Sequence, residues 1–177
     1  MNKVRISEIV REPLTLAEVK QFLKVETAEE NALLSMWISL AREACEQFTG
    51  RALITQDWRL DTAVARRVGL SPGPVQQILQ VDHIMGQQSE TLESGRYECV
   101  RQGGDAELVL EKHPGQGRLV IDFRTGYGDD WNAVPLSLRQ GMLRLVAHYH
   151  RFRDASDALA MPAAVSALWR PFRVYGL

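Results

Sequence analysis

The chain has 177 residues, of which 45% are hydrophobic and 24% are charged. These are ordinary values for a globular protein, and one core can bury roughly 70% of the unfolded surface of such a chain, so a single domain is expected. The formal net charge of -1 argues against a sequence-reading nucleic-acid binder. No apolar run approaches the roughly 18 residues of a membrane span, and residues 1–13 are charged rather than signal-like, so the protein is expected to be cytosolic when made.

Two helices are predicted before residue 50. Thr15 and Glu18 form a capping-box pair, and a short helix should follow and end near Val25. A second pair, Thr27 with Glu30, predicts the start of the longest helix. Its apolar residues recur at helical spacing: Leu33, Leu34, Trp37, Ile38, Ala41, Ala44, Cys45 and Phe48.

The junction after this helix is the most informative part of the chain. Residues 41–58 read A-R-E-A-C-E-Q-F-T-G-R-A-L-I-T-Q-D-W. The helix should end at about Thr49, with Gly50 in the left-handed position that follows many helices. Alternation of apolar and polar residues then indicates a strand, so the period changes from 3.6 to 2.

The middle of the chain is predicted to be β-rich. Turn chemistry at residues 71–74, 103–105 and 114–117 separates the expected strands. Five short strands are expected, at 54–60, 75–85, 97–101, 107–110 and 119–124, and they should form one small antiparallel sheet inserted between helical ends.

The last third is expected to be helical. Residues 126–128 should end the last strand, and Pro135 is placed as the first residue of a helix. A final short helical turn should begin at Met161 and end at Pro171. The apolar stripe of the longer helix comprises Leu138, Met142, Leu145, Val146, Tyr149 and Phe152.

Residues 127–130, Y-G-D-D, resemble the catalytic turn of viral RNA polymerases. That chemistry needs a further aspartate and a strand after the turn, whereas a helix is expected here, so a solvated strand-to-helix loop is the favoured interpretation. His148 and His150 are two residues apart on a helix and cannot hold one ion together. Neither cysteine has a C-x-x-C partner, and no nucleophile elbow or phosphate-binding loop is present, so no cofactor, metal or catalytic residue is predicted.

Arginines at 139, 144, 151 and 153 could bind nucleic acid, with Tyr149 and Phe152 as stacking partners. The favoured interpretation is the exposed face of a helix whose other face is core. The C-terminal string at residues 168–177, L-W-R-P-F-R-V-Y-G-L, is different. It combines aromatic anchors with arginines, a composition typical of interface centres. Such a chain end either folds back on its own core or docks into a neighbouring protein, and the residues alone leave both possibilities open.

Several strings in order carry a family resemblance: L-T-L-A-E-V-K, E-E-N-A-L-L, F-T-G-R-A-L-I-T-Q-D-W, F-R-T-G-Y-G-D and L-W-R-P-F-R-V. From residue 14 to about 174 the chain resembles the head-tail connector proteins of long-tailed phages, prophages and gene-transfer particles. Residues 1–13 have no match in that resemblance. The expected fold is α+β: a mainly helical connector with an inserted small antiparallel sheet and an extended C-terminal tail. One domain is expected, with helices at about 14–50 and 135–170, the β-rich insertion at 53–125 and the tail at 171–177.

The resemblance implies a structural, non-enzymatic virion protein at the head-tail interface, made in the host cytoplasm. Its implied partners are the portal protein, copies of itself in a dodecameric ring, a stopper or tail-completion protein, and packaged DNA passing through the lumen without sequence-specific binding. No membrane partner is implied. The alternative is a DNA-contacting or enzymatic accessory protein of phage assembly. The implied portal-binding residues are Trp169, Arg170, Pro171, Phe172, Arg173, Val174, Tyr175, Gly176 and Leu177.

Overall fold

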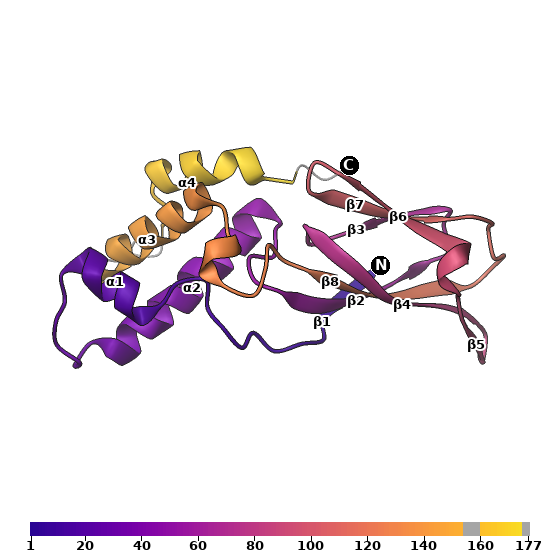
Figure 1. Cartoon of the computed structure of the whole chain (residues 1–177), viewed down its shortest axis with the longest axis horizontal. Coiled ribbons are helices and arrows are strands. Elements are labelled where there is room, and N and C mark those ends of the chain that lie inside the picture. Colours follow the sequence, from indigo (N-terminus) through magenta and orange to yellow (C-terminus); the bar gives the residue numbers. More distant parts are fainter. Residues whose placement is uncertain (154–159, 175–177) are drawn as a thin grey trace. The chain divides into compact units, whose positions relative to one another are not determined.

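The structure is a computed structural model that describes residues 1–153 and 160–174. The chain divides into two compact units. Met1–Ile9 and Thr55–Gly126 form the first, here called the β unit, and Val10–Ile54 with Tyr127–Leu177 form the second, here called the helical unit. Each unit is thus built from segments far apart in the sequence (Figure 1). Whether the two act as one connector domain stays a prediction.

The expectation of a mainly helical fold is wrong. Of the residues described, 35% are helical and 33% are in strands, and the strands form two sheets rather than one small one. The fold is therefore mixed α+β. The described residues contain eight strands, three more than the sequence predicted.

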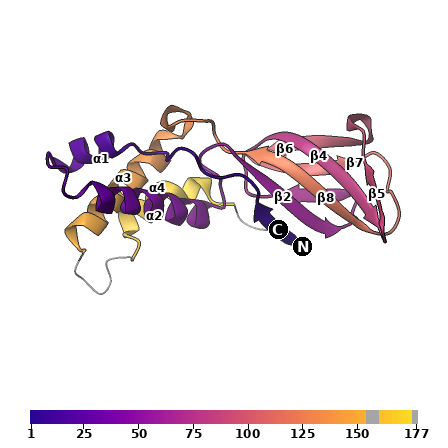
Figure 2. The same cartoon turned by 90° about the horizontal axis from the view of Figure 1, so that it is seen from below.

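The strands of the β unit pair in two antiparallel sheets (Figures 1 and 2). The larger sheet has the order β1-β2-β8-β4-β5, and the smaller has the order β3-β7-β6. The strand bounds are β1 Asn2–Arg5, β2 Gln56–Ala63, β3 Arg67–Leu70, β4 Val75–Met85, β5 Gln88–Thr91, β6 Tyr97–Gln102, β7 Asp105–Leu110 and β8 Arg118–Thr125.

The three strands that were not predicted are all short edge strands. β1, β3 and β5 have four residues each, and every residue of β1 and β5 is exposed. The exposed strands β1 and β5 need no apolar alternation, so their sequences give no strand signal. β3 does alternate over its four residues, with Val68 and Leu70 buried, so its signal was present but short. The other five strands begin and end within a few residues of the expected positions.

Both sheets contribute side chains to one apolar core, as in a β-sandwich. In β8 every second residue is buried, and Leu119, Ile121 and Phe123 are fully so. They meet Leu108 and Leu110 of β7 in the same cluster. The Gly103–Gly104 turn, with both residues at positive φ, joins β6 to β7 as the sequence predicted.

The helical unit contains α1 Leu16–Leu23, α2 Asn31–Thr49, α3 Leu136–Arg151 and α4 Ala163–Trp169. Short 3₁₀ turns η2 Trp131–Ala133 and η3 Arg170–Phe172 precede α3 and follow α4, and η1 Ser94–Arg96 belongs to the β unit. The α2 helix ends at Gly50, whose φ is 70°, as predicted. Pro135 is the N-cap of α3 rather than its first residue.

Only one of the two predicted capping boxes forms. The Oγ1 atom of Thr15 accepts from the backbone N–H of Glu18, whose carboxylate accepts from the N–H of Thr15. At α2 the N-cap is Glu30, which has no side-chain capping bond, so the Thr27 box is wrong. The Glu30 carboxylate instead bonds His150 at 3.0 Å and Arg153 at 2.9 Å, because α3 brings these partners beside it.

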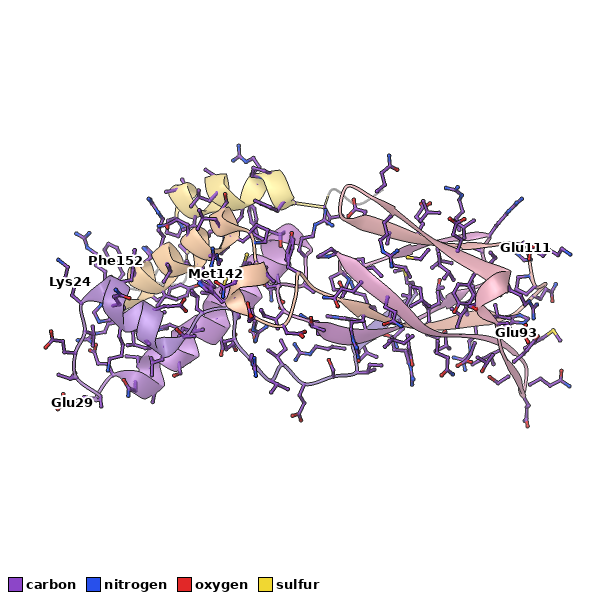
Figure 3. The ribbon with its side chains drawn as sticks, viewed as in Figure 1. Lys24, Glu29, Glu93, Glu111, Met142 and Phe152 are labelled. Carbon is purple, nitrogen blue, oxygen red and sulfur yellow. The ribbon has the colours of Figure 1, made fainter. Side chains whose placement is uncertain are left out.

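The core of the helical unit lies among α1, α2, α3 and α4. Met142 of α3, which Figure 3 labels, is fully buried there, and both predicted helical stripes contribute to the cluster. Phe152 departs from its stripe and is 41% exposed. No helix in the described parts of the chain is long and apolar enough to cross a bilayer.

Candidate functional site

The C-terminal segment rests on the junction that follows α2. The backbone N–H of Val174 donates to the Thr49 carbonyl at 2.8 Å. Nε of Arg51 donates to the Phe172 carbonyl at 3.1 Å, and Arg51 is only 7% exposed. Two backbone groups of the segment are therefore fixed by groups at the end of α2.

The side chains at this junction continue the contact. The Arg173 guanidinium lies 5.5 Å from the ring centroid of Phe48, within cation–π range. A Cβ built on Gly50 would lie 3.3 Å from Cβ of Val174, so the lack of a side chain at Gly50 lets the C-terminal segment approach closely. Gly50 itself also has a positive φ, which glycine adopts readily. The four-residue string F-T-G-R thus forms the seat of the C-terminal segment.

The predicted site residues divide into buried and exposed members. Trp169 is fully buried, and its indole N–H donates to the Leu138 carbonyl at 3.2 Å. Phe172 is half-buried against the helical core. The side chains of Arg170 and Arg173 are exposed, as is Pro171, which lies inside η3 instead of ending the helical segment. The remaining predicted residues, Tyr175, Gly176 and Leu177, lie outside the described residues.

Up to Val174, the segment folds back on its own unit. The exposed groups that it presents are Arg170, Pro171 and Arg173, on a support made by Trp169 and Phe172. The sequence did not identify Phe48, Thr49 and Arg51 as members of this site. Their signal was present in the junction string, but only a folded chain brings residues more than a hundred positions apart together.

Two groups considered for catalysis, Asp130 and Cys45, take part in capping and in core packing. Asp130 of the Y-G-D-D string accepts from the N–H of Asn132 at 2.7 Å and caps η2, in a loop between β8 and α3 as predicted. Burial, followed by the nearby Glu46 charge, raises the pKa of the Cys45 thiol, which has no exposed surface. A raised thiol pKa disfavours the thiolate, which is the nucleophilic form.

The histidines and arginines of α3 are likewise dispersed. His150 bonds Glu30, whereas His148 packs on Phe152 with ring centroids 4.8 Å apart. Among residues 1–153 and 160–174, no group of three His, Cys, Asp or Glu side chains is placed to hold a metal ion. The Arg139 guanidinium lies 4.6 Å from the Trp131 ring centroid, whereas Arg153 pairs with Glu30 at 2.9 Å, so these two arginines have different partners.

The comparisons with known proteins identify the family of this chain. Residues 12–159 match the family model described as head completion protein. The chain belongs to the head completion protein family. It is therefore a structural protein and not an enzyme. The search of curated proteins gave no match.

Solved structures similar to this head completion protein come from gene transfer agent (GTA) particles. A chain in the neck of an empty GTA particle, computed with C6 symmetry, has 26% identity and a TM-score of 0.83. A chain in the virion of a native GTA particle has 25% identity and the same TM-score, 0.83. A chain in the neck of a native GTA particle, computed with C12 symmetry, has 26% identity and a TM-score of 0.74. Each match covers 100% of this chain and 97% of the other chain.

Proposed function

We propose that this head completion protein is a head-tail connector that forms a ring beneath the portal of a phage-like particle. The observation that carries the proposal is full-length similarity to chains in particle necks, one of them in a map computed with C12 symmetry. Its place is the virion, at the head-tail interface. The ring would extend the DNA channel without reading sequence and would present a surface to a stopper or tail-completion protein.

Portal binding is assigned in this proposal to the C-terminal segment, from Trp169 to Leu177. The side chains of Arg170 and Arg173 are exposed, and their positive charge favours acidic groups on a partner, while the fully buried Trp169 fixes the start of the segment. Arg51 and Thr49 then hold the backbone at Phe172 and Val174. A segment fixed in this way loses less conformational entropy on binding than a free chain end would.

The function is tested with DNA-filled heads made without this protein, to which purified protein is added before tails. The full chain should bind the heads and allow tails to attach, which is scored by electron microscopy. Full-length protein that binds but leaves heads without tails would contradict the connector function.

The role of the segment is tested by deleting residues 172–177. The shortened protein should remain folded, because most of the helical core lies elsewhere, but it should fail to bind the heads. Binding with unchanged affinity would move the portal contact to another surface, and an unfolded product would show that the segment is core.

The point variant Phe172→Ala tests one side chain of the segment, and circular dichroism checks that it is folded, because Phe172 is half-buried against the helical core. If Phe172 fills a portal pocket, Phe172→Ala should weaken binding by on the order of 2 kcal/mol. Phe22→Ala removes an equally large ring that is 44% exposed on α1, so it serves as the matched control and should bind normally. Equal binding by the two variants would argue against a portal pocket for Phe172.

A further inference from the structure

A groove in the helical unit lies apart from the C-terminal segment. Its volume is about 500 Å³, and it is lined by the residues before α1, the first turn of α1 and η2. The floor of the groove is apolar, since Leu14 is 2% exposed and Trp131 is half-buried. An open groove with such a floor is suited to a long side chain that carries its charge at the tip.

The rim of this groove is acidic. Three carboxylates line it, those of Glu12, Glu18 and Asp130, against the single guanidinium of Arg11. Each carboxylate is held by hydrogen bonds within the helical unit, which fixes its direction: Glu12 accepts from Ser39 and Arg42, Glu18 from Thr15, and Asp130 from Asn132. Glu12 also forms an ion pair with Arg42 at 2.8 Å, so Glu18 and Asp130 carry the negative charge that favours a cationic occupant.

A basic face on α3 has complementary charge. Arg144 and Arg151 are both exposed, and among the described residues neither has a carboxylate within ion-pair distance. They are seven residues apart and so share one face of the helix. This pair is here called the arginine face.

The arginine face cannot reach the groove of its own subunit. Arg139 marks the groove side of α3, because its guanidinium lies 4.6 Å from the Trp131 ring centroid. Arg144 follows Arg139 by five residues, which turns it about 140° around the helix axis. The two complementary surfaces therefore point in different directions and can meet only between two molecules.

We propose that the groove of one subunit receives the arginine face of a second copy of this chain. Because two different surfaces meet, the contact is heterologous, and repetition closes a ring when the rotation between subunits permits. The inference rests on the proposed function, since a ring beneath the portal brings copies side by side. It adds to that function the pair of surfaces that join neighbouring subunits.

The test uses full-length protein bound to DNA-filled heads, followed by amine-reactive cross-linking and counting of linked subunits on a gel. The double variant Arg144→Glu with Arg151→Glu places like charges against the groove, so products larger than a monomer should fall by on the order of tenfold. Arg66→Glu reverses an exposed arginine in the β unit and is the matched control. It should give the full ladder of products.

Restoration by a second charge reversal identifies the pairing. Glu18→Arg should also reduce the ladder, and combining Glu18→Arg with Arg144→Glu should restore most of it. Glu18→Gln retains a residue that can complete the capping box, so it shows how much of the loss is due to charge and how much to a weakened α1. Circular dichroism of each variant checks that it is folded.

The outcomes separate this inference from the function. An unchanged ladder for the double arginine variant overturns the inference, as does failure of the combined reversal when all the proteins are folded. If Glu18→Arg does not fold, the arginine variants still decide, because those side chains have no carboxylate partner in the described structure. Failure of the wild-type protein to allow tail attachment would instead overturn the proposed function.

Discussion

At the scale of single residues, Trp169 combines a role in the core with its position at the start of the C-terminal segment. It is fully buried and lies against Gly141 of α3, where an added Cβ would overlap the indole ring. Gly141 is therefore required by the close approach of α4 to α3, although its own conformation is that of an ordinary helical residue.

Gly141→Ala should destabilise the protein by about 1–3 kcal/mol, because the indole must move out of its position in the core. Gly69→Ala is the control, since a Cβ on Gly69 would meet nothing within 4 Å. Urea unfolding followed by tryptophan fluorescence should show a lower midpoint for the first variant only. Equal midpoints would mean that α4 can shift without cost.

At the scale of elements, the starts of α1 and α2 show how similar sequence signals lead to different outcomes. Thr15 caps α1 with its side chain, whereas Thr27 lies outside α2 and caps nothing. The competing interaction at α2 is tertiary, because Glu30 bonds His150 and Arg153 of the α3 region.

Thr15→Ala should lower the free energy of unfolding by about 1 kcal/mol, the usual effect of losing an N-cap. Thr27→Ala should change it by less than about 0.5 kcal/mol, because the side chain is exposed and makes no capping bond. Thermal unfolding of the two single variants, recorded in parallel, measures the difference. A larger loss for Thr27→Ala would contradict the assignment of the caps.

The N-terminal strand β1 lies before the region matched by the family model, which begins at residue 12. It pairs with β2 in register from Asn2↔Asp61 to Arg5↔Trp58, and all of its residues are exposed. The strand therefore covers the backbone of β2 and buries little apolar surface.

Deleting residues 1–5 should leave the β-sandwich folded with only a small decrease in thermal midpoint. The exposed β2 edge should then promote self-association, because an uncovered strand offers unpaired backbone groups to other chains. Light scattering at increasing protein concentration measures this, with the full-length protein as control. A large loss of stability would show that β1 belongs to the core of the sheet.

At the scale of the whole molecule, we expect assembly to depend on the particle. Rings that closed before a portal was available would be unproductive, so the free protein is predicted to be monomeric and to associate on docking. Cross-linking with purified portal should give a ladder that ends near twelve subunits, the order of the C12 map of the similar GTA neck. Saturation at one or two subunits would contradict this prediction.

Local patterns in the sequence determined several helix ends, strand limits and turns of this protein, and its family. The capping box of α1, the end of α2 at Gly50, the limits of β4 and the turn before β7 depend on neighbouring residues, so they could be predicted. The ordered strings of the resemblance also indicated the family, because each string is itself a run of neighbouring residues.

Only the tertiary structure decided the edge strands and the seat of the C-terminal segment, because both depend on contacts between residues far apart in the sequence. The exposed edge strands β1 and β5 are defined by backbone pairing rather than by an apolar pattern. The seat of the C-terminal segment joins Arg51 to Phe172, 121 residues apart in the chain. No local preference encodes such a contact; it exists because packing of the helical core brings the end of α2 beside the segment that follows α4.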